Sequence, residues 1–132
     1  MAKLRHIAIN CDDLEVSAKF YSGAFELEEV GRAGDISSMG AIYLSDGTVN
    51  VALIKISDPD YPNAKPDGLN HIGFVVPDVD QAVARVEALG ATAVVDPTAA
   101  GSGATWEMKM KTPDGVGFDL SQHGWPGISG LD

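Results

Sequence analysis

The stretch LRHIAINCDDLE at residues 4–15 returns in related form as LNHIGFVVPDVD at residues 69–80. The two stretches align without a gap at an offset of 65 residues, and leucine, histidine, isoleucine and aspartate recur at matching positions. Each stretch begins as a short apolar strand that contains a histidine, His6 in the first and His71 in the second. Self-similarity at a fixed offset indicates duplicated units, so the chain is predicted to consist of two related halves.

Each half is predicted to form a strand, a helix and three further strands. The first strands cover about residues 3–10 and 69–76, and the helices follow Asp13 and Asp78, which are suitable N-cap residues. Apolar residues recur at helical spacing from Val79 to Leu89, and Gly90 stands at the C-cap position. The remaining strands are expected near residues 27–33, 38–45 and 48–56 in the first half, and near 91–96, 105–111 and 116–122 in the second.

The whole chain, residues 1–132, is expected to be a single domain, because it is long enough for two small halves that share a core. The first half, module one, covers about residues 3–56, and module two covers about residues 69–122. A polar, proline-containing linker at residues 57–68 joins them. The tail, residues 123–132, is expected to be mobile, although His123 and Trp125 could cover the site of this chain or of a partner.

Charge and composition limit the kinds of partner. The formal net charge of −10 argues against nucleic acid, because phosphate binding needs clustered lysine and arginine. No apolar run approaches the ~20 residues of a membrane span, and no signal peptide is recognised at the start. Cys11 is the single cysteine, which excludes an internal disulfide and fits a reducing compartment. We therefore expect a cytoplasmic protein that binds a small molecule.

Three polar residues are predicted to share one face of the sheet. The large apolar residues of the strands must pack beneath the helices, so alternation puts His6, His71 and Asp119 on the opposite face. Two histidines and a carboxylate form the facial set favoured by iron(II) oxygenases, and the set also suits zinc, manganese or nickel. The alternative is that they are ordinary half-buried, hydrogen-bonded residues, and from the residues alone the two interpretations are about even.

Two further candidates lie on the strand predicted at residues 105–111. If Met108 and Met110 pack below the helix, Glu107 and Lys109 face the same side as the histidines. Glu107 is then a candidate general base or partner of the metal ligands, and Lys109 a candidate for binding a substrate oxyanion. The alternative is a charged pair on a wet strand face. Tyr43 is interpreted as a packing residue.

Taken together, these stretches resemble the vicinal-oxygen-chelate superfamily, which includes glyoxalase I, bleomycin- and fosfomycin-resistance proteins and type I extradiol dioxygenases. The resemblance covers roughly residues 3–122 and is carried by LRHIAINCDDLEVSAKFYSGAFEL, LNHIGFVVPDVDQAVARVEALGA and TPDGVGFDLSQ. It implies an α+β fold in which two βαβββ modules form a cup-shaped mixed sheet with helices on the outer face. It also implies a divalent metal ion (iron, manganese, zinc or nickel) held by His6, His71 and Asp119.

The resemblance leaves several functions open. The superfamily's fourth ligand position falls on Ala52, which cannot bind a metal, and Asn50 on the same face is displaced from it by about 7 Å. Glyoxalase I-like members carry Glu or Gln at that position, where it takes part in proton transfer. The three-ligand set slightly favours dioxygenase-type chemistry on a small substrate with adjacent oxygens, and a glyoxalase-like lyase or isomerase is the first alternative. The second is a non-catalytic protein that sequesters a small hydrophobic or drug-like molecule, as in bleomycin resistance.

A homodimer is also implied, since superfamily members of this length commonly dimerise. Some of them exchange modules between chains, in which case His6 and His71 could come from different subunits.

Overall fold

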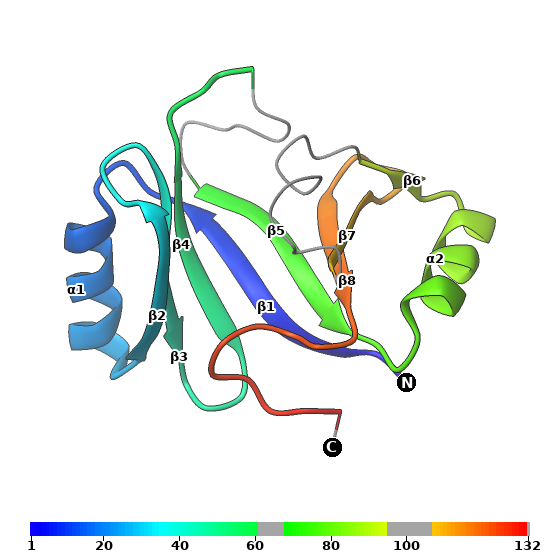
Figure 1. The fold of residues 1–132 in the computed structure, drawn as a ribbon, viewed down its shortest axis with the longest axis horizontal. Coiled ribbons are helices and arrows are strands. Elements are labelled where there is room, and N and C mark those ends of the chain that lie inside the picture. Colours follow the sequence, from blue (N-terminus) through cyan, green and yellow to red (C-terminus); the bar gives the residue numbers. More distant parts are fainter. Residues whose placement is uncertain (61–67, 95–106, 132) are drawn as a thin grey trace.

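The computed structural model describes residues 1–60, 68–94 and 107–131 (Figure 1). Its elements are, in chain order, β1 (Lys3–Asn10), α1 (Leu14–Phe25), β2 (Glu28–Asp35), β3 (Met39–Ser45), β4 (Asn50–Ile56), β5 (Gly68–Val75), α2 (Val79–Ala88), β6 (Thr92–Ala93), β7 (Glu107–Lys111) and β8 (Gly117–Ser121). A strand, a helix and three strands therefore occur twice in succession, which confirms the predicted α+β fold of two modules.

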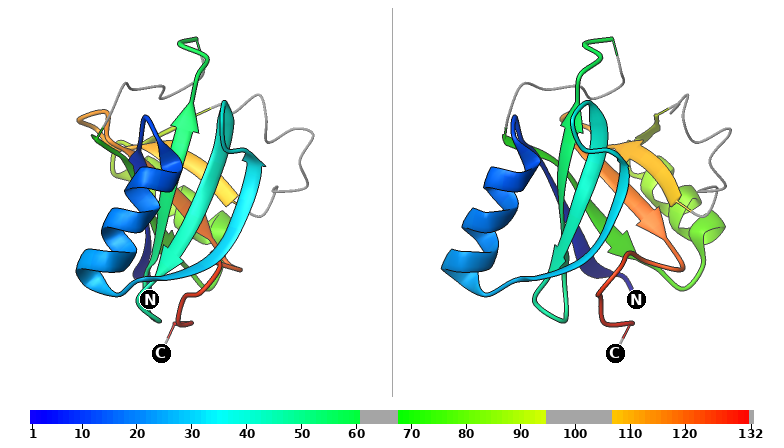
Figure 2. Two further views of the ribbon diagram at one scale, coloured as in Figure 1. Left: turned by 90° about the vertical axis from the view of Figure 1, so that its left-hand side faces the viewer. Right: turned by 60° about the vertical axis from the view of Figure 1, so that its left-hand side comes forward.

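The eight strands form one curved sheet in the order β2-β3-β4-β1-β5-β8-β7-β6. At its centre β1 and β5 pair antiparallel, and each has a parallel partner on its other side, β4 or β8. The strand order is thus the same outward in both directions, as expected for a duplicated unit. The helices flank the sheet on its two outer sides, α1 beside module one and α2 beside module two (Figures 1 and 2).

Both helices begin where the sequence predicts. The carboxylate of Asp13 accepts a hydrogen bond from the backbone N–H of Val16, and the carboxylate of Asp78 accepts one from Gln81. These bonds satisfy N–H groups that have no partner within the helix. Beyond α2, Gly90 has a φ of 104°, a left-handed conformation that glycine adopts without strain, and this confirms its predicted place at the helix end.

Each module has its own apolar core beneath its helix. In module one, buried side chains of α1 pack against β3 and β4, and in module two α2 packs against β7 and β8. The core of module one contains Leu14, Ala18, Ile42, Leu44 and Leu53, and that of module two contains Val76, Ala82, Met110, Phe118 and Leu120. Because the apolar side chains occupy the helix side, the polar side chains of alternate residues lie on the inner, concave side.

Two of the predicted segments lie only partly within the described residues. The strand expected at residues 91–96 is only Thr92–Ala93, and the rest of that segment, with the loop 97–103 and the start of the next strand, lies largely outside the described residues. The linker 57–68 is described except for residues 61–67.

None of the described helices combines the length and the apolar character that a membrane span requires.

The tail, which the sequence predicts to be mobile, packs against module one in the structure. The carbonyl of Gly127 accepts a hydrogen bond from Ser45 Oγ at 2.6 Å, and the N–H of Ser129 donates to the carbonyl of Thr48 at 3.2 Å. Trp125 is buried, with 8% of its surface exposed. The segment after β8 therefore turns back under the sheet toward β3 and β4 (Figure 1), because burial of its indole and these bonds offset the entropy lost on ordering.

Candidate metal centre

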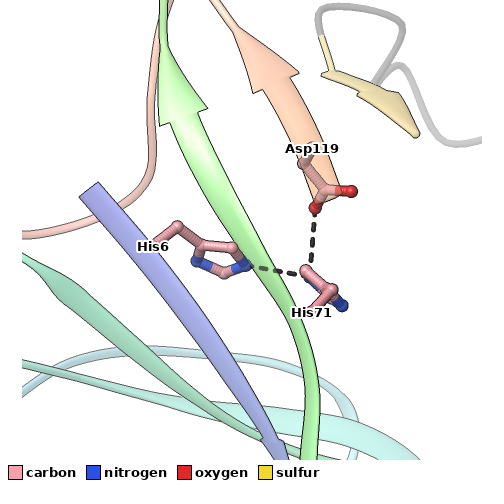
Figure 3. Close-up of side chains that lie close together, drawn as sticks. All are labelled: His6, His71 and Asp119. Atoms are coloured by element: carbon pink, nitrogen blue, oxygen red, sulfur yellow. Dashed lines mark hydrogen bonds and ion pairs between the residues drawn. The ribbon is translucent and has the colours of Figure 1, made fainter. Parts of the chain in front are cut away.

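Three side chains from the central strands converge on the concave face (Figure 3). His6 comes from β1, His71 from β5 and Asp119 from β8, and their candidate ligand atoms all lie within 4.8 Å of one another. His6 Nε2 is 3.1 Å from His71 Nε2, which is 3.0 Å from Asp119 Oδ2. The strand register explains this meeting, because Gly73 pairs with His6 on one side and with Asp119 on the other. Since glycine has no side chain, the side chains of His6 and Asp119 can approach each other across it.

The tautomer of His6 is fixed by its hydrogen bonds. His6 Nδ1 lies 2.7 Å from Asn50 Oδ1, while Asn50 Nδ2 donates to the carbonyl of Pro126 at 2.9 Å. A backbone carbonyl can only accept, so the amide of Asn50 must point its NH2 group at Pro126 and its oxygen at His6. His6 Nδ1 therefore carries the proton, and Nε2 presents a lone pair toward His71 and Asp119.

His71 is held in the same way by a different residue. Its Nδ1 lies 2.6 Å from Asn70 Oδ1. The pairing of β1 with β5 shifts register between Ala8 and Ile9, where Asn70 is the extra residue of a bulge. A bulge re-aims a side chain that regular alternation would turn away, which allows Asn70 to reach its neighbour's ring. His71 Nδ1 donates to Asn70, and its Nε2 lone pair also points inward.

The three inward atoms are all acceptors, and this arrangement fits a metal ion. Burial, together with the nearby His71 ring, lowers the pKa of His6 to about 3, and burial lowers the pKa of His71 to about 4. Both rings are therefore neutral at pH 7. Their Nδ1 protons are donated to Asn50 and Asn70, so their Nε2 lone pairs point toward each other and toward Asp119. Neutral imidazoles with a carboxylate are ligands for divalent transition metals, and an ion between the two Nε2 atoms would relieve the repulsion of their lone pairs.

Ala52 lies where a fourth ligand would be expected from the symmetry of the modules. It pairs with Ala8 across β4 and β1 in the same way that Asp119 pairs with Gly73 across β8 and β5. Asn50, noted in the sequence only for its distance from Ala52, is fully buried and holds His6 instead. The missed signal is positional: Asn50 is the residue of β4 paired directly with His6.

Glu107 and Lys109 both lie beside the three converging side chains. Lys109 Nζ is 3.4 Å from both oxygens of Asp119 and 3.6 Å from Glu107 Oε2. Burial raises the pKa of Glu107, and the negative charge of Asp119 raises it further against the opposing effect of Lys109. Met108 and Met110 pack in the core beneath α2, so β7 has the orientation that the sequence predicts.

The tail brings one more side chain to the site. The indole of Trp125 stacks on the imidazole of His6, with ring centroids 4.4 Å apart and planes 9° from parallel. Trp125 Nε1 also donates a hydrogen bond to Glu107 Oε1 at 2.7 Å. Trp125 thus covers the site of its own chain, one of the two possibilities left open by the sequence. His123 is exposed and is not among the residues that converge there.

Tyr43, interpreted above as a packing residue, lies next to this group. It pairs with Ala52 across β3 and β4 and is only partly buried. Burial raises the pKa of its hydroxyl, and the charge of Glu107 adds to that effect. The phenol is therefore within electrostatic reach of Glu107 from the opposite module.

Comparisons with known proteins agree with the fold. Residues 3–120 match a family model described as the Glyoxalase/Bleomycin resistance protein/Dioxygenase superfamily. A comparison with curated proteins gives no match.

Solved structures extend the comparison. A hypothetical protein from Bacillus halodurans C-125 is 21% identical, with a TM-score of 0.71 over 91% of this chain and 93% of that one. A Streptomyces coelicolor methylmalonyl-CoA epimerase variant, in complex with 2-nitronate-propionyl-CoA, is 21% identical, with a TM-score of 0.68 over 89% and 94%. The methylmalonyl-CoA epimerase from Mycobacterium tuberculosis is 19% identical, with a TM-score of 0.67 over 89% and 85%. At these identities the similarity shows a shared fold.

Proposed function

Because the chain belongs to the Glyoxalase/Bleomycin resistance protein/Dioxygenase superfamily, we propose that it is a metal-dependent enzyme that transfers a proton on a small substrate with adjacent oxygen atoms. His6, His71 and Asp119 would hold a divalent ion of iron, manganese, zinc or nickel. The observation that carries this proposal is the convergence of His6, His71 and Asp119 beside a partly buried carboxylate, Glu107. Such an ion supplies a Lewis acid that polarises a substrate oxygen.

Glu107 has the properties of a general base. Its raised pKa brings its proton affinity closer to neutral pH, where proton transfer to a carboxylate is most efficient. Trp125 holds Oε1 by a hydrogen bond, which fixes the orientation of the carboxylate and leaves Oε2 on the side of Lys109. A proton taken from carbon beside a polarised carbonyl would pass to Oε2.

Lys109 would stabilise the negative charge that this step leaves on the substrate. Its ammonium lies within 3.6 Å of both carboxylates, so it is already in a position to meet an oxyanion between them. A preorganised charge in a site with little water lowers the barrier more than the same charge in solution. Glu107 and Lys109 together support isomerase, epimerase or lyase chemistry.

Dioxygenase chemistry is the second candidate, favoured by a different observation. Two histidines and one carboxylate without a fourth protein ligand, as the alanine at position 52 leaves them, form the set typical of iron(II) oxygenases. That reaction does not depend on Glu107 as a proton acceptor. Substitution of Glu107 should therefore reduce proton transfer more than dioxygenase activity.

The test starts with metal content and then separates the two reactions. Protein purified without chelator is analysed for metal and reconstituted with each of the four ions. Solvent deuterium uptake into methylmalonyl-CoA and into small 2-hydroxy ketones is followed by NMR, and oxygen consumption is measured with catechols and Fe(II). We expect deuterium uptake that falls ~10²–10⁴-fold in Glu107→Gln while metal content is unchanged. Glu87→Gln, on the exposed side of α2, is the matched control.

Other outcomes select the other functions. Oxygen consumption without deuterium uptake would replace proton transfer by dioxygenase chemistry. No uptake of any of the four metals would reject the enzyme proposal altogether. Micromolar binding of a hydrophobic molecule that persists in His71→Ala would then identify a sequestration protein.

We also propose that the protein acts in the cytoplasm as a homodimer of single-domain chains. One chain already contains His6, His71 and Asp119 together, so the dimer would not need to exchange modules to complete the site. Sedimentation equilibrium gives the oligomeric state, and one cooperative unfolding transition is expected for a single domain.

A further inference from the structure

We propose that the C-terminal segment, residues 122–131, is a positioning element of the metal centre that fixes both the tautomer and the ring plane of His6. This proposal rests on the proposed function for its metal, but its structural part does not need one. The segment follows residues 3–120, which match the superfamily model.

The tautomer is controlled through a relay of two hydrogen bonds. The carbonyl of Pro126 accepts from Asn50 Nδ2, and this orients the amide so that Asn50 Oδ1 accepts from His6 Nδ1. Without Pro126 the amide of Asn50 is free to turn over and donate to His6. The ring would then need its lone pair on Nδ1 and its proton on Nε2, where it would block a metal.

The ring plane is controlled by stacking. Trp125 lies almost parallel to His6, so its indole limits rotation of the imidazole about the side-chain bonds. Its Nε1 donates to Glu107 at the same time. One residue of the segment therefore ties a proposed metal ligand of module one to the proposed base of module two.

The absence of a side chain at Gly73 leaves room on the sheet for the indole of Trp125. A Cβ placed on Gly73 would lie 2.7 Å from the Trp125 ring and 2.8 Å from His6 Cβ, so only glycine allows both side chains to occupy their places. The segment follows its path with left-handed glycines at Gly124 and Gly127, whose φ angles are 77° and 78°. Two residues after Trp125, the carbonyl of Gly127 accepts a hydrogen bond from Ser45 Oγ.

The experiment compares four variants of the full chain. Trp125→Phe keeps a stacking ring but loses the donor to Glu107, Trp125→Leu loses both, and Asn50→Leu breaks the relay to Pro126. Ser129→Ala is the control, because it changes the same segment and removes only a 3.3 Å bond to the carbonyl of Gly47. Metal-free protein is studied by nitrogen-15 NMR of the imidazoles, with the His6 signals assigned by their loss in His6→Gln. The affinity for Zn²⁺ is then measured by calorimetry.

In the wild type and in Ser129→Ala, we expect the His6 signals of a single tautomer with the proton on Nδ1. In Asn50→Leu, which lacks the relay, the two nitrogen shifts should move toward each other, which indicates exchange between tautomers. Trp125→Leu should show the same change, because loss of the buried indole releases the adjacent Pro126 from Asn50. The affinity for Zn²⁺ should fall ~10–100-fold in these two variants, as for other partners of metal ligands. Trp125→Phe should keep most of the affinity, because the ring still stacks.

Two results would overturn the proposal. If Trp125→Leu and Asn50→Leu melt at a lower temperature but keep the wild-type His6 tautomer and Zn²⁺ affinity, the segment only covers the core. If the His6 signals of the wild type already show two tautomers, the relay does not exist. Failure of the wild type to bind Zn²⁺ or the other metals rejects the proposed function instead, and the NMR measurement still decides the role of the segment. Should Trp125→Leu not fold, Asn50→Leu still decides whether the relay fixes the tautomer, and Trp125→Phe decides whether the bond from Trp125 to Glu107 contributes to Zn²⁺ affinity.

Discussion

The two modules have the same backbone plan but supply different chemistry to the concave face. His6 and His71 occupy equivalent positions in the two modules. The strand pairings show that Ala52 of module one is equivalent to Asp119 of module two, and that Tyr43 is equivalent to Lys109. Module two thus provides the buried charges, while module one provides one neutral imidazole and uncharged side chains. Because the proposed ion would have His6, His71 and Asp119 as ligands, a second set of carboxylates would add buried charge without a partner.

This difference shows how a duplicated unit can become one site. Symmetry brings two sets of positions to a shared face, and substitution then keeps only one set charged. The neutral module still contributes through Asn50, which is paired directly with His6, and through the bonds that Ser45 and Asn50 make to the C-terminal segment.

The largest effect is expected when module two is made to resemble module one. Asp119→Ala removes the only negatively charged member of the three converging ligands and copies the residue found at position 52. We expect the loss in Zn²⁺ affinity to exceed the ~10–100-fold typical of residues that only support a ligand. Calorimetric titration measures it, and Asp114→Ala, in the turn before β8, is the control. Retained affinity would show that Asp119 is not a ligand.

The apolar cores should be more alike than the two sides of the site. Leu53 in module one and Met110 in module two are both almost fully buried beneath their helices. Truncation of either to alanine is expected to lower the free energy of unfolding by about 2–5 kcal/mol. Denaturant titration followed by circular dichroism measures the loss. If one variant shows two transitions, the modules unfold separately and the chain is not a single cooperative domain.

Acid should weaken the metal-free protein through both modules. The folded-state pKa values of His6 and His71, about 3 and about 4, lie below that of an unfolded histidine. The unfolded state therefore binds more protons between about pH 6.5 and these values, so stability is present above that window and is lost as the pH falls through it. The loss should amount to a few kcal/mol for each ring.

Thermal unfolding of metal-free protein at pH 7, 5 and 4 tests this dependence. Because carboxylates such as Glu107 also titrate there, the wild type is compared with His6→Gln, in which their effects largely cancel. The variant should show the weaker dependence on pH, and His123→Gln, at an exposed position, should behave as the wild type. Equal slopes in all three proteins would mean that the buried ring of His6 is not linked to stability.

The sequence was sufficient for the parts of the site that repetition and alternation control. The offset between His6 and His71 predicted two modules, and the period of two along β7 and β8 put Glu107, Lys109 and Asp119 on the concave side, where they lie. These patterns are local, because each depends only on the regular geometry of a strand.

The contacts that the sequence missed or left open, as it did for Trp125, depend on departures from that geometry. Asn70 belongs to a bulge, where strict alternation turns a side chain to the wrong face. Trp125 follows the last strand in a segment without periodicity, and its position depends on a glycine more than 50 residues earlier in the chain. The hydrogen bond between Asn50 and His6 depends on which strands are neighbours, which no single strand reveals.

A smaller change in the opposite direction sharpens the comparison of the modules. Ala52→Asp gives module one the carboxylate that module two has at position 119, in the equivalent register against β1. Position 52 is almost fully buried, so without metal an unpaired polar side chain there should lower the free energy of unfolding by about 1–3 kcal/mol, and by more when it is charged. With Zn²⁺ bound it can act as a fourth ligand, and we expect the affinity to rise while the lost stability is regained. Thermal unfolding with and without Zn²⁺ measures both effects, and Ala52→Asn, without the charge, is the matched control. If Zn²⁺ restores no more stability to the aspartate variant than to the asparagine variant, position 52 does not face the ion, and the equivalence of the two modules ends at the histidines.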